Sequence, residues 1–342
     1  VKHYTKQILF ASMILLNRGK NDSEKGQLTM KNKLKSCAIL ATLGAITIHL
    51  INKTLIEMAT KDSLLNSSEG NYYDWRFGKI FYKKEGSGTP LLLVHTLDAA
   101  ASSAEWKYLM DKLVENHTVY VLDLLGCGKS DKPQITYTNY LYVQLISDFI
   151  RNVIGQKTDI IASGNASSFV IMACNMEDSL FRKIMILNPE TASQISRMPK
   201  GSSRMLRKLL ELPIVGTLLY NILYSRRHIL KRLEETYFSP CYINHELPKI
   251  YAENAHTNEL GGKCLMASLK SHFVNINITK ALHAIDNSIY LIVGEENPDK
   301  EAILAYYCET NPAIETYEIP YSKKYSQVDG QDRLLKQIEI FF

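Results

Sequence analysis

The stretch "IIASGNASSFV", residues 160–170, combines two local patterns that together decide the fold. Its first half belongs to the apolar run "TDIIAS" (158–163), which is typical of a strand buried on both faces of a sheet. Its second half enters "SSFVIMACN" (167–175), which favours a helix. The small residues at 164–166 lie between them, so the stretch predicts a tight turn from a strand into a helix.

The same alternation continues on both sides of this stretch. A hairpin of two alternating strands is predicted first, over residues 72–90 around Gly78. Further strands are predicted at 91–94, 118–126, 183–189, 288–294 and 314–320, and amphipathic helices at 104–116 and 139–155. Strands alternating with helices imply an α/β fold, with a mostly parallel sheet covered by helices on both faces.

The segment 191–286 carries helical periodicity and no strand signal, which predicts an inserted helical cap. It divides the core into a first part, 71–190, and a second part, 287–342. From Lys200 to Arg232 the cap has eight basic residues and one acid. This charge fits a solvated helix face over an apolar pocket lid, and it also fits a face attracted to anionic lipid.

The composition excludes several classes of protein. With 46% hydrophobic and 22% charged residues among 342, the chain is typical of a globular protein with a sizeable core. The net charge of +5 is modest and no nucleic-acid-binding motif accompanies it, so no nucleic-acid partner is expected. The six cysteines are scattered without a C-x-x-C pair, which favours free thiols; no metal and no cofactor is expected.

The N-terminal part is expected to differ from the rest. Residues 1–29 show no period and are interpreted as a poorly defined extension, followed at 30–70 by a candidate membrane anchor and linker. The apolar run 36–51 is 16 residues long, just below the ~17 to 25 of a spanning helix. A single uncleaved anchor is the preferred hypothesis, and a cleaved signal segment or a helix packed on the domain are the alternatives.

The side of the membrane stays open. Lys31, Lys33 and Lys35 precede the apolar run, which favours a cytoplasmic N-terminal side and a domain outside. Free cysteines favour the opposite, because exported proteins tend to avoid unpaired thiols.

Several segments recur in the order of a known superfamily. His95 and Thr96 follow the first buried strand, and "DLLGCGKSD" (123–131) follows the second with its glycines two residues apart. With the strand–turn–helix stretch and the cap, this order resembles the α/β-hydrolase superfamily, in its esterase, lipase and epoxide-hydrolase-like branch, over roughly residues 72–342.

The resemblance implies a serine nucleophile at the centre of a G-x-S-x-G turn, followed along the chain by an acid and a histidine. Here Gly164 and Ser168 flank Ala166, which cannot attack a substrate. The acid position holds Asn297, and the histidine position aligns with Lys324.

Alternatives for these positions are few. Glu190, Glu295, Glu296 and Asp299 are other places for the acid, but no histidine follows His283 anywhere in the chain. All three catalytic positions have therefore lost their chemistry together, which favours a pseudoenzyme.

The resemblance also implies positions for the oxyanion-hole amides and for residues that line a pocket. The amides of Leu97 and Ser167 are the oxyanion-hole equivalents. His95, Thr96 and Asn165 are expected to lie at a pocket, with His95 more plausible as a hydrogen-bonded loop residue than as a base.

The functional hypothesis is a membrane-associated α/β-hydrolase-fold protein that binds a small apolar or lipid-like ligand, or a partner, without turning it over. The alternative is an active hydrolase of a small ester or lipid-like substrate that uses a displaced nucleophile, Ser163 or Ser167.

Overall fold

The computed structural model describes residues 35–342, apart from 63, 65–68, 245 and 258–260. The chain divides into two compact units, Val1–Ile51 and Asn52–Phe342, and each is described by itself. The expected extension at 1–29, together with Lys31 and Lys33, lies outside the described residues.

The second unit is built on an eight-stranded sheet with the order β1-β2-β4-β3-β5-β6-β7-β8. β1 and β2 form an antiparallel hairpin, β2 pairs antiparallel with β4, and all other neighbours are parallel. The strands are β1 Asn71–Trp75, β2 Gly78–Glu85, β3 Thr89–Val94, β4 His117–Leu122, β5 Thr158–Ser163, β6 Phe181–Leu187, β7 Ser288–Gly294 and β8 Glu315–Ile319. The predicted α/β class with a mostly parallel sheet is confirmed.

The central strands are buried on both faces, as their unbroken apolar runs indicate. Successive side chains of a strand point to opposite faces. Leu92 and Val94 of β3 accordingly belong to one hydrophobic cluster, whereas Leu91 and Leu93 belong to another. Each face of the sheet therefore has its own core.

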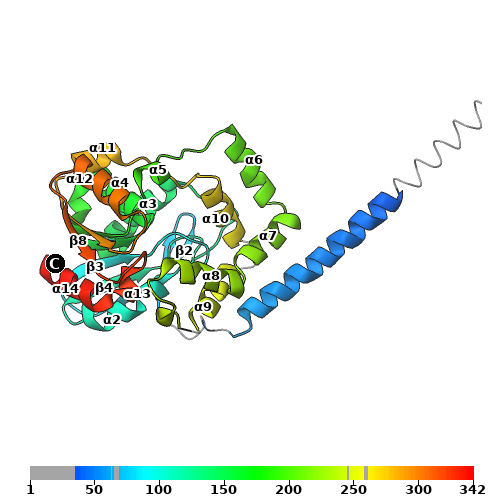
Figure 1. Ribbon diagram of the computed structural model, residues 1–342, viewed down its shortest axis with the longest axis horizontal. Helices are drawn as coiled ribbons and strands as arrows, with labels where there is room; N and C mark the ends of the chain where they lie inside the picture. The colour runs from blue at the N-terminus through cyan, green and yellow to red at the C-terminus, as the bar shows by residue number, and fades with distance from the viewer. Residues whose placement is uncertain (1–34, 63, 65–68, 245, 258–260) are drawn as a thin grey trace, which may run out of the picture. The chain divides into compact units, whose positions relative to one another are not determined.

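Two groups of helices supply these cores. The smaller cluster contains residues of α2 (Lys107–Leu113) and α14 (Gln331–Phe341). The larger cluster contains residues of α3 (Asn139–Phe149), α4 (Ala166–Met176), α11 (Thr279–Ala284) and α12 (Lys300–Thr310). Figure 1 shows α2 and α14 on one side of the strands and α3, α4, α11 and α12 on the other.

The described residues between β6 and β7 form helices and no strand, as the periodicity predicts. We call this segment, residues 191–286, the helical insertion. Before α11 it contains α5 Ala192–Ile195, α6 Gly201–Leu210, α7 Val215–Leu223, α8 Arg226–Thr236, the short η4 Pro240–Tyr242, α9 Leu247–His256 and α10 Gly261–Lys270. Its last helix, α11, contacts α4 and α12 and so belongs to the cover of the sheet.

The N-terminal helix is longer than the apolar run 36–51 suggests. It extends over Lys35–Thr60, 26 residues, and it is the one helix among the described residues long and apolar enough to cross a membrane. Length and composition alone fit both an anchor and a signal segment. Its C-terminal end, from Asn52 onward, belongs to the second unit, where Asn52 is buried and hydrogen-bonded to α7.

The turn after β4 depends on a glycine. Gly128 has φ +48, and the Asp123 carboxylate lies against its Cα while accepting hydrogen bonds from the amides of Ser103 (2.6 Å) and Lys129 (2.8 Å). A Cβ at this position would collide with that carboxylate.

We expect Gly128→Ala to destabilise the second unit by about 2 to 4 kcal/mol, as the sum of left-handed strain of ~1 to 2 kcal/mol and the displaced carboxylate. Gly155→Ala is the matched control, because Gly155 also has positive φ (+74) but has open space at its Cβ. Urea unfolding of both variants measures the difference. An equal decrease in the free energy of unfolding in both variants would show that the close approach of the Asp123 carboxylate to Gly128 does not contribute to stability.

Candidate functional site

The turn between β5 and α4 lies at the carboxyl edge of the sheet. β5 ends at Ser163, Gly164 and Asn165 form the turn, and α4 begins at Ala166. Gly164 has φ +56, a left-handed backbone, and its amide donates to the Leu187 carbonyl at 2.9 Å. Ala166 is fully buried as the first residue of the helix.

This geometry corrects the expected centre of the turn. In the α/β-hydrolases that the sequence resembles, the nucleophile occupies the strained residue between strand and helix. That residue is Gly164, and Ala166 is already helical. The apex moves by two residues, with Ala162 and Ala166 as its small flanking residues, and it still carries no nucleophile.

The apex also has no room for a side chain. A Cβ on Gly164 would lie 2.5 Å from Thr96 Oγ1. Real Cβ atoms avoid such a separation, so either the Thr96 side chain or the turn would have to move before a serine could be accommodated at position 164.

The Leu97 amide, expected as an oxyanion-hole donor, is engaged within the protein. It donates to Asn165 Oδ1 at 2.7 Å, while Asn165 Nδ2 donates back to the Leu97 carbonyl at 3.1 Å. Thr96 Oγ1 donates to the same Oδ1 at 3.2 Å. The other expected donor, the Ser167 amide, donates to the Gly164 carbonyl at 3.2 Å. Both amides therefore already have acceptors.

The expected acid position holds an amide in a neutral network. Asn297 is buried; its Nδ2 donates to Asn188 Oδ1 at 2.9 Å and its Oδ1 accepts from the Asp299 amide at 3.0 Å. The same Asn188 oxygen accepts from the Gly294 amide at 2.9 Å. Asn297 thus ties two loops together by amide pairing, without a charge to stabilise an imidazolium.

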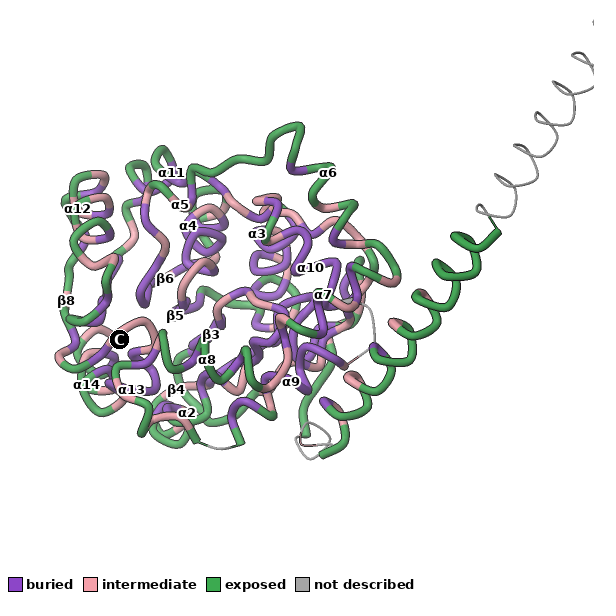
Figure 2. The backbone as a smooth tube through the Cα atoms, turned by 45° about the vertical axis from the view of Figure 1, so that its right-hand side comes forward, coloured by how far each residue is buried: buried purple, intermediate pink, exposed green. Residues whose placement is uncertain are grey.

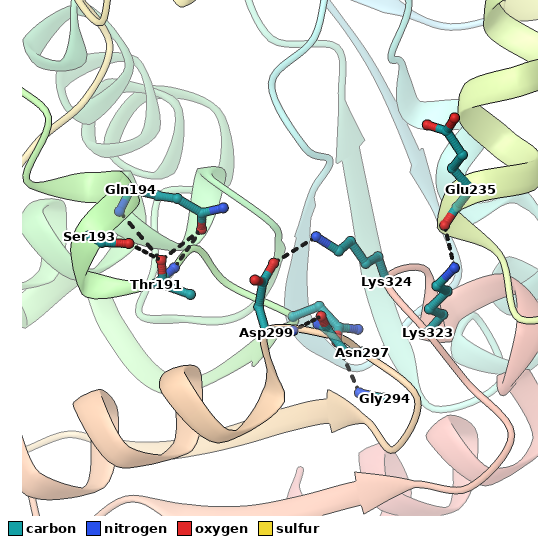
Figure 3. A network of polar contacts seen from close by, with 10 residues as sticks. Thr191, Ser193, Gln194, Glu235, Gly294, Asn297, Asp299, Lys323 and Lys324 are labelled. Atoms are coloured by element: carbon teal, nitrogen blue, oxygen red, sulfur yellow. Dashed lines mark hydrogen bonds and ion pairs between the residues drawn. The ribbon is translucent and has the colours of Figure 1, made fainter.

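Lys324, at the expected histidine position, pairs with a neighbouring acid instead of with Asn297. Its Nζ lies 2.8 Å from Asp299 Oδ2 (Figure 3). Burial raises the pKa of Glu190, and the nearby Lys324 charge opposes that rise. Glu295 and Glu296, the remaining alternatives for the acid, are both exposed. The backbone amide of Glu296 donates to the Ser322 carbonyl.

His95 is a hydrogen-bonded loop residue. Its Nδ1 lies 2.7 Å from the Thr96 carbonyl and its Nε2 accepts the Leu124 amide at 3.0 Å, which assigns the proton to Nδ1. Complete burial lowers the pKa of His95, so the neutral ring is favoured. With both nitrogens engaged, this ring has no free position for accepting a proton.

The displaced-nucleophile alternative can be compared with the same geometry. Ser163 Oγ accepts from Gln327 Nε2 at 3.3 Å, and Ser167 Oγ donates to the Ala162 carbonyl at 3.3 Å. Within the described part of the chain, no histidine ring is hydrogen-bonded to either serine.

A buried acid next to Ser163 escaped the sequence analysis. Glu105 Oε1 accepts from Gln327 Nε2 at 2.5 Å, and Oε2 accepts the Thr96 amide at 3.2 Å. Burial raises the pKa of Glu105 to about 7, while hydrogen bonds from Ser163, Thr96 and Gln327 oppose the rise. Nothing local distinguishes Glu105 from an ordinary acid in a first helical turn, because Gln327 lies 222 residues away.

A cavity of about 240 Å³ lies between the loop after β3 and the helical insertion. Of the residues predicted to lie at a pocket, Thr96 lines this cavity. The side chains of His95 and Asn165 form the hydrogen bonds described above and do not line it. Its charged part is the pair of Arg232 with Asp98 at 3.2 Å. The remaining lining residues are Leu97, Ala100, Ala101, Ile229, Leu233, Thr236, Tyr251 and Tyr325.

Comparison with known proteins agrees with this architecture. No protein-family model matches the chain. It is 35% identical over 71 residues to the 2-hydroxy-6-oxo-6-(2'-aminophenyl)hexa-2,4-dienoic acid hydrolase of Metapseudomonas resinovorans, 20% of this chain and 24% of that protein. It is 25% identical over 141 residues to an uncharacterised protein of Mycobacterium bovis, 39% of this chain and 40% of that protein. The chain thus spans less than half the length of these relatives.

Solved structures extend the likeness to most of the chain. An epoxide hydrolase superimposes with a TM-score of 0.65 at 17% identity, over 80% of this chain and 98% of its own. A meta-cleavage product hydrolase superimposes with a TM-score of 0.64 at 14% identity, over 80% of this chain and 97% of its own. A carboxylesterase of Bacillus subtilis superimposes with a TM-score of 0.59 at 14% identity, over 86% of this chain and 98% of its own. The chain has the α/β-hydrolase fold.

The Glu105 cluster predicts a pH dependence of stability. An acid whose folded pKa is raised from 4.5 to about 7 keeps a proton in the folded state that the unfolded chain has lost. Stability should therefore fall as pH rises from about 4.5 to 7, by up to ~3 kcal/mol. Glu105→Gln should remove this fall, and its new amide can pair with Gln327 Oε1, for which the described residues supply no hydrogen-bond partner.

Urea unfolding at several pH values between 5 and 8 measures this effect. Glu115→Gln is the control, because the Glu115 side chain is 58% exposed. If Glu105→Gln and the wild type lose stability in parallel over this range, Glu105 is not the titrating group.

Proposed function

We propose that this chain is a membrane-associated, non-catalytic member of the α/β-hydrolase fold that binds a small apolar or lipid-like ligand. The observation that carries the proposal is the two-way hydrogen bonding between Asn165 and Leu97, which occupies an expected oxyanion-hole amide. The side-chain-free apex at Gly164, the amide at Asn297 and the ion-paired Lys324 support the same conclusion.

The ligand is inferred from the cavity. Its volume of about 240 Å³ lies just below the ~300 to 1,000 Å³ of drug-sized ligand pockets, which suits a short apolar molecule. Ile229, Leu233 and Tyr251 supply apolar contact, and the Asp98–Arg232 pair can orient one polar end.

The loss of catalysis can be tested directly on the purified full chain. It should not hydrolyse chromogenic esters above the buffer rate, and a fluorophosphonate probe should not label it, because no activated nucleophile is available. Ser202→Ala, at an exposed serine, serves as the comparison for any background labelling. Labelling that disappears in Ser163→Ala or Ser167→Ala would establish the alternative, an active hydrolase with a displaced nucleophile.

Ligand binding can be tested with ethyl butyrate, a small water-soluble ester, by saturation-transfer NMR. We expect transfer from the full chain and its loss in Leu233→Trp, because the indole would fill the cavity. Leu230→Trp, on the exposed side of the same helix, should retain the signal. Equal signals in the two variants would contradict binding in this cavity.

We infer membrane association from the length and apolar composition of the N-terminal helix. The full chain should sediment with membranes and resist extraction by high salt, since burial of apolar surface is not screened. A chain beginning at Asn52 keeps the contacts of Asn52 with α7 and should become largely soluble. Recovery of the full chain in the soluble fraction without detergent would refute the anchor.

A further inference from the structure

Two neighbouring helices of the helical insertion expose apolar side chains at helical spacing. Met205 and Leu209 lie on α6, Leu212 follows just beyond its end, and all three are exposed, Met205 by 77%. Residues three and four apart share one helix face. In a water-soluble domain such a stripe normally faces the core.

The next helix repeats the arrangement. Val215, Leu219 and Ile222 of α7 are again spaced by four and three and are all exposed, Val215 by 58%. α6 contacts α7, and Figure 2 shows the length of α6 as largely exposed. We call these two sets of residues the apolar stripes.

A basic pocket opens at the start of α6. Its volume is about 720 Å³, and its basic lining residues are Arg197, Lys200, Lys270 and His272, with no acid. In the part of the chain that the structure describes, none of these four residues forms an ion pair. The positive end of the α6 helix dipole adds to the same potential. The pocket therefore favours an anion.

Apolar and basic residues are interleaved on α6 itself. Arg204 and Lys208 are exposed and four residues apart, and each directly precedes one of the stripe residues Met205 and Leu209. A helix with adjacent basic and apolar faces is typical of the boundary between lipid headgroups and acyl chains.

Asn52, where the second unit begins, is hydrogen-bonded beside these stripes. Asn52 Nδ2 donates to the Ile214 carbonyl at 3.2 Å, and Asn221 Nδ2 donates to Asn52 Oδ1 at 3.0 Å. Ile214 directly precedes the stripe residue Val215, and the apolar run 36–51 directly precedes Asn52 along the chain. Asn52, the first residue of the second unit, is therefore held against α7.

We propose that the basic pocket binds the headgroup of an anionic phospholipid, while the apolar stripes of α6 and α7 lie in the same leaflet. Charge complementarity favours an anionic headgroup over a neutral one, because the lining holds four basic side chains and no acid. The inference rests on the proposed membrane association and does not depend on the absence of catalysis.

The test uses the full chain in nanodiscs of phosphatidylcholine, with and without phosphatidylglycerol, read by hydrogen exchange. We expect phosphatidylglycerol to slow exchange in residues 197–206 and 270–273, with no change in α14. Arg197→Gln with Lys270→Gln should raise the phosphatidylglycerol fraction needed for half-maximal protection by about tenfold or more, at ~1 kcal/mol for each charge. The matched control, Lys231→Gln with Lys249→Gln, removes two exposed charges outside the pocket and should leave that fraction nearly unchanged.

Each other outcome contradicts a defined part of the inference. Equal protection in neutral and anionic discs would refute the headgroup site while leaving the anchor intact. Protection of the same segments by inorganic phosphate in neutral discs would identify a free anion as the ligand. A chain that does not stay with discs of either composition would refute the membrane association itself.

The apolar stripes are tested by a fluorophore. The exposed Cys37 and Cys241 are first replaced by serine, and an environment-sensitive dye is attached through Leu209→Cys. Its emission should shift to the blue in the anionic discs, because the stripe enters an apolar medium. Ile340→Cys, 75% exposed on α14, should show no shift. Equal spectra at both sites would refute burial of the stripe in lipid.

Discussion

The hydrogen bonds between the Asn165 side chain and the backbone of Leu97 hold together the loops that follow two neighbouring strands. β3 and β5 pair in parallel up to Val94 and Ala162, and the Asn165 amide continues this ladder after the strands have ended. The loop after β3 thereby receives a fixed course along the cavity that Thr96 and Leu97 line. The Asn165 side chain that orders this loop also places its Oδ1 on the Leu97 amide, where the family resemblance predicts the developing negative charge of a substrate.

A second amide network organises the other part of this edge. Asn188 follows β6 and has a left-handed backbone at φ +43; it accepts from Gly294 and Asn297 and donates from Nδ2 to Ser326 Oγ at 2.9 Å. Buried polar groups satisfied in this way need no charge and carry no dependence on pH. The Lys324–Asp299 pair beside it is about one-third exposed and adds at most ~1 kcal/mol.

Most of the sheet could be predicted from the sequence because burial on both faces leaves unbroken apolar runs. The strands at 91–94, 158–163 and 288–294 are found where those runs lie. The sequence prediction places the apex of the turn two residues too far along the chain, because it uses the spacing of small flanking residues. The decisive property is the left-handed backbone that Gly164 adopts without strain.

The remaining parts of the site depend on contacts that no local pattern contains. Asn165 meets Leu97 across 68 residues, and Glu105 meets Gln327 across 222. The docking of Asn52 on Asn221 spans 169 residues, so the apolar run indicated only part of the helix that the structure contains. Such pairings require the strand order before they can be inferred.

The crowding of Gly164 by Thr96 has a consequence for how this sequence can change over time. A codon change that introduced serine at position 164 would by itself cost stability, and the Leu97 amide would remain engaged by Asn165. Positions 96, 165, 297 and 324 would each have to change before such a serine met the groups that acyl transfer requires. Thr96 and Asn165 would therefore have to move together before a serine at position 164 could gain both space and a free backbone amide.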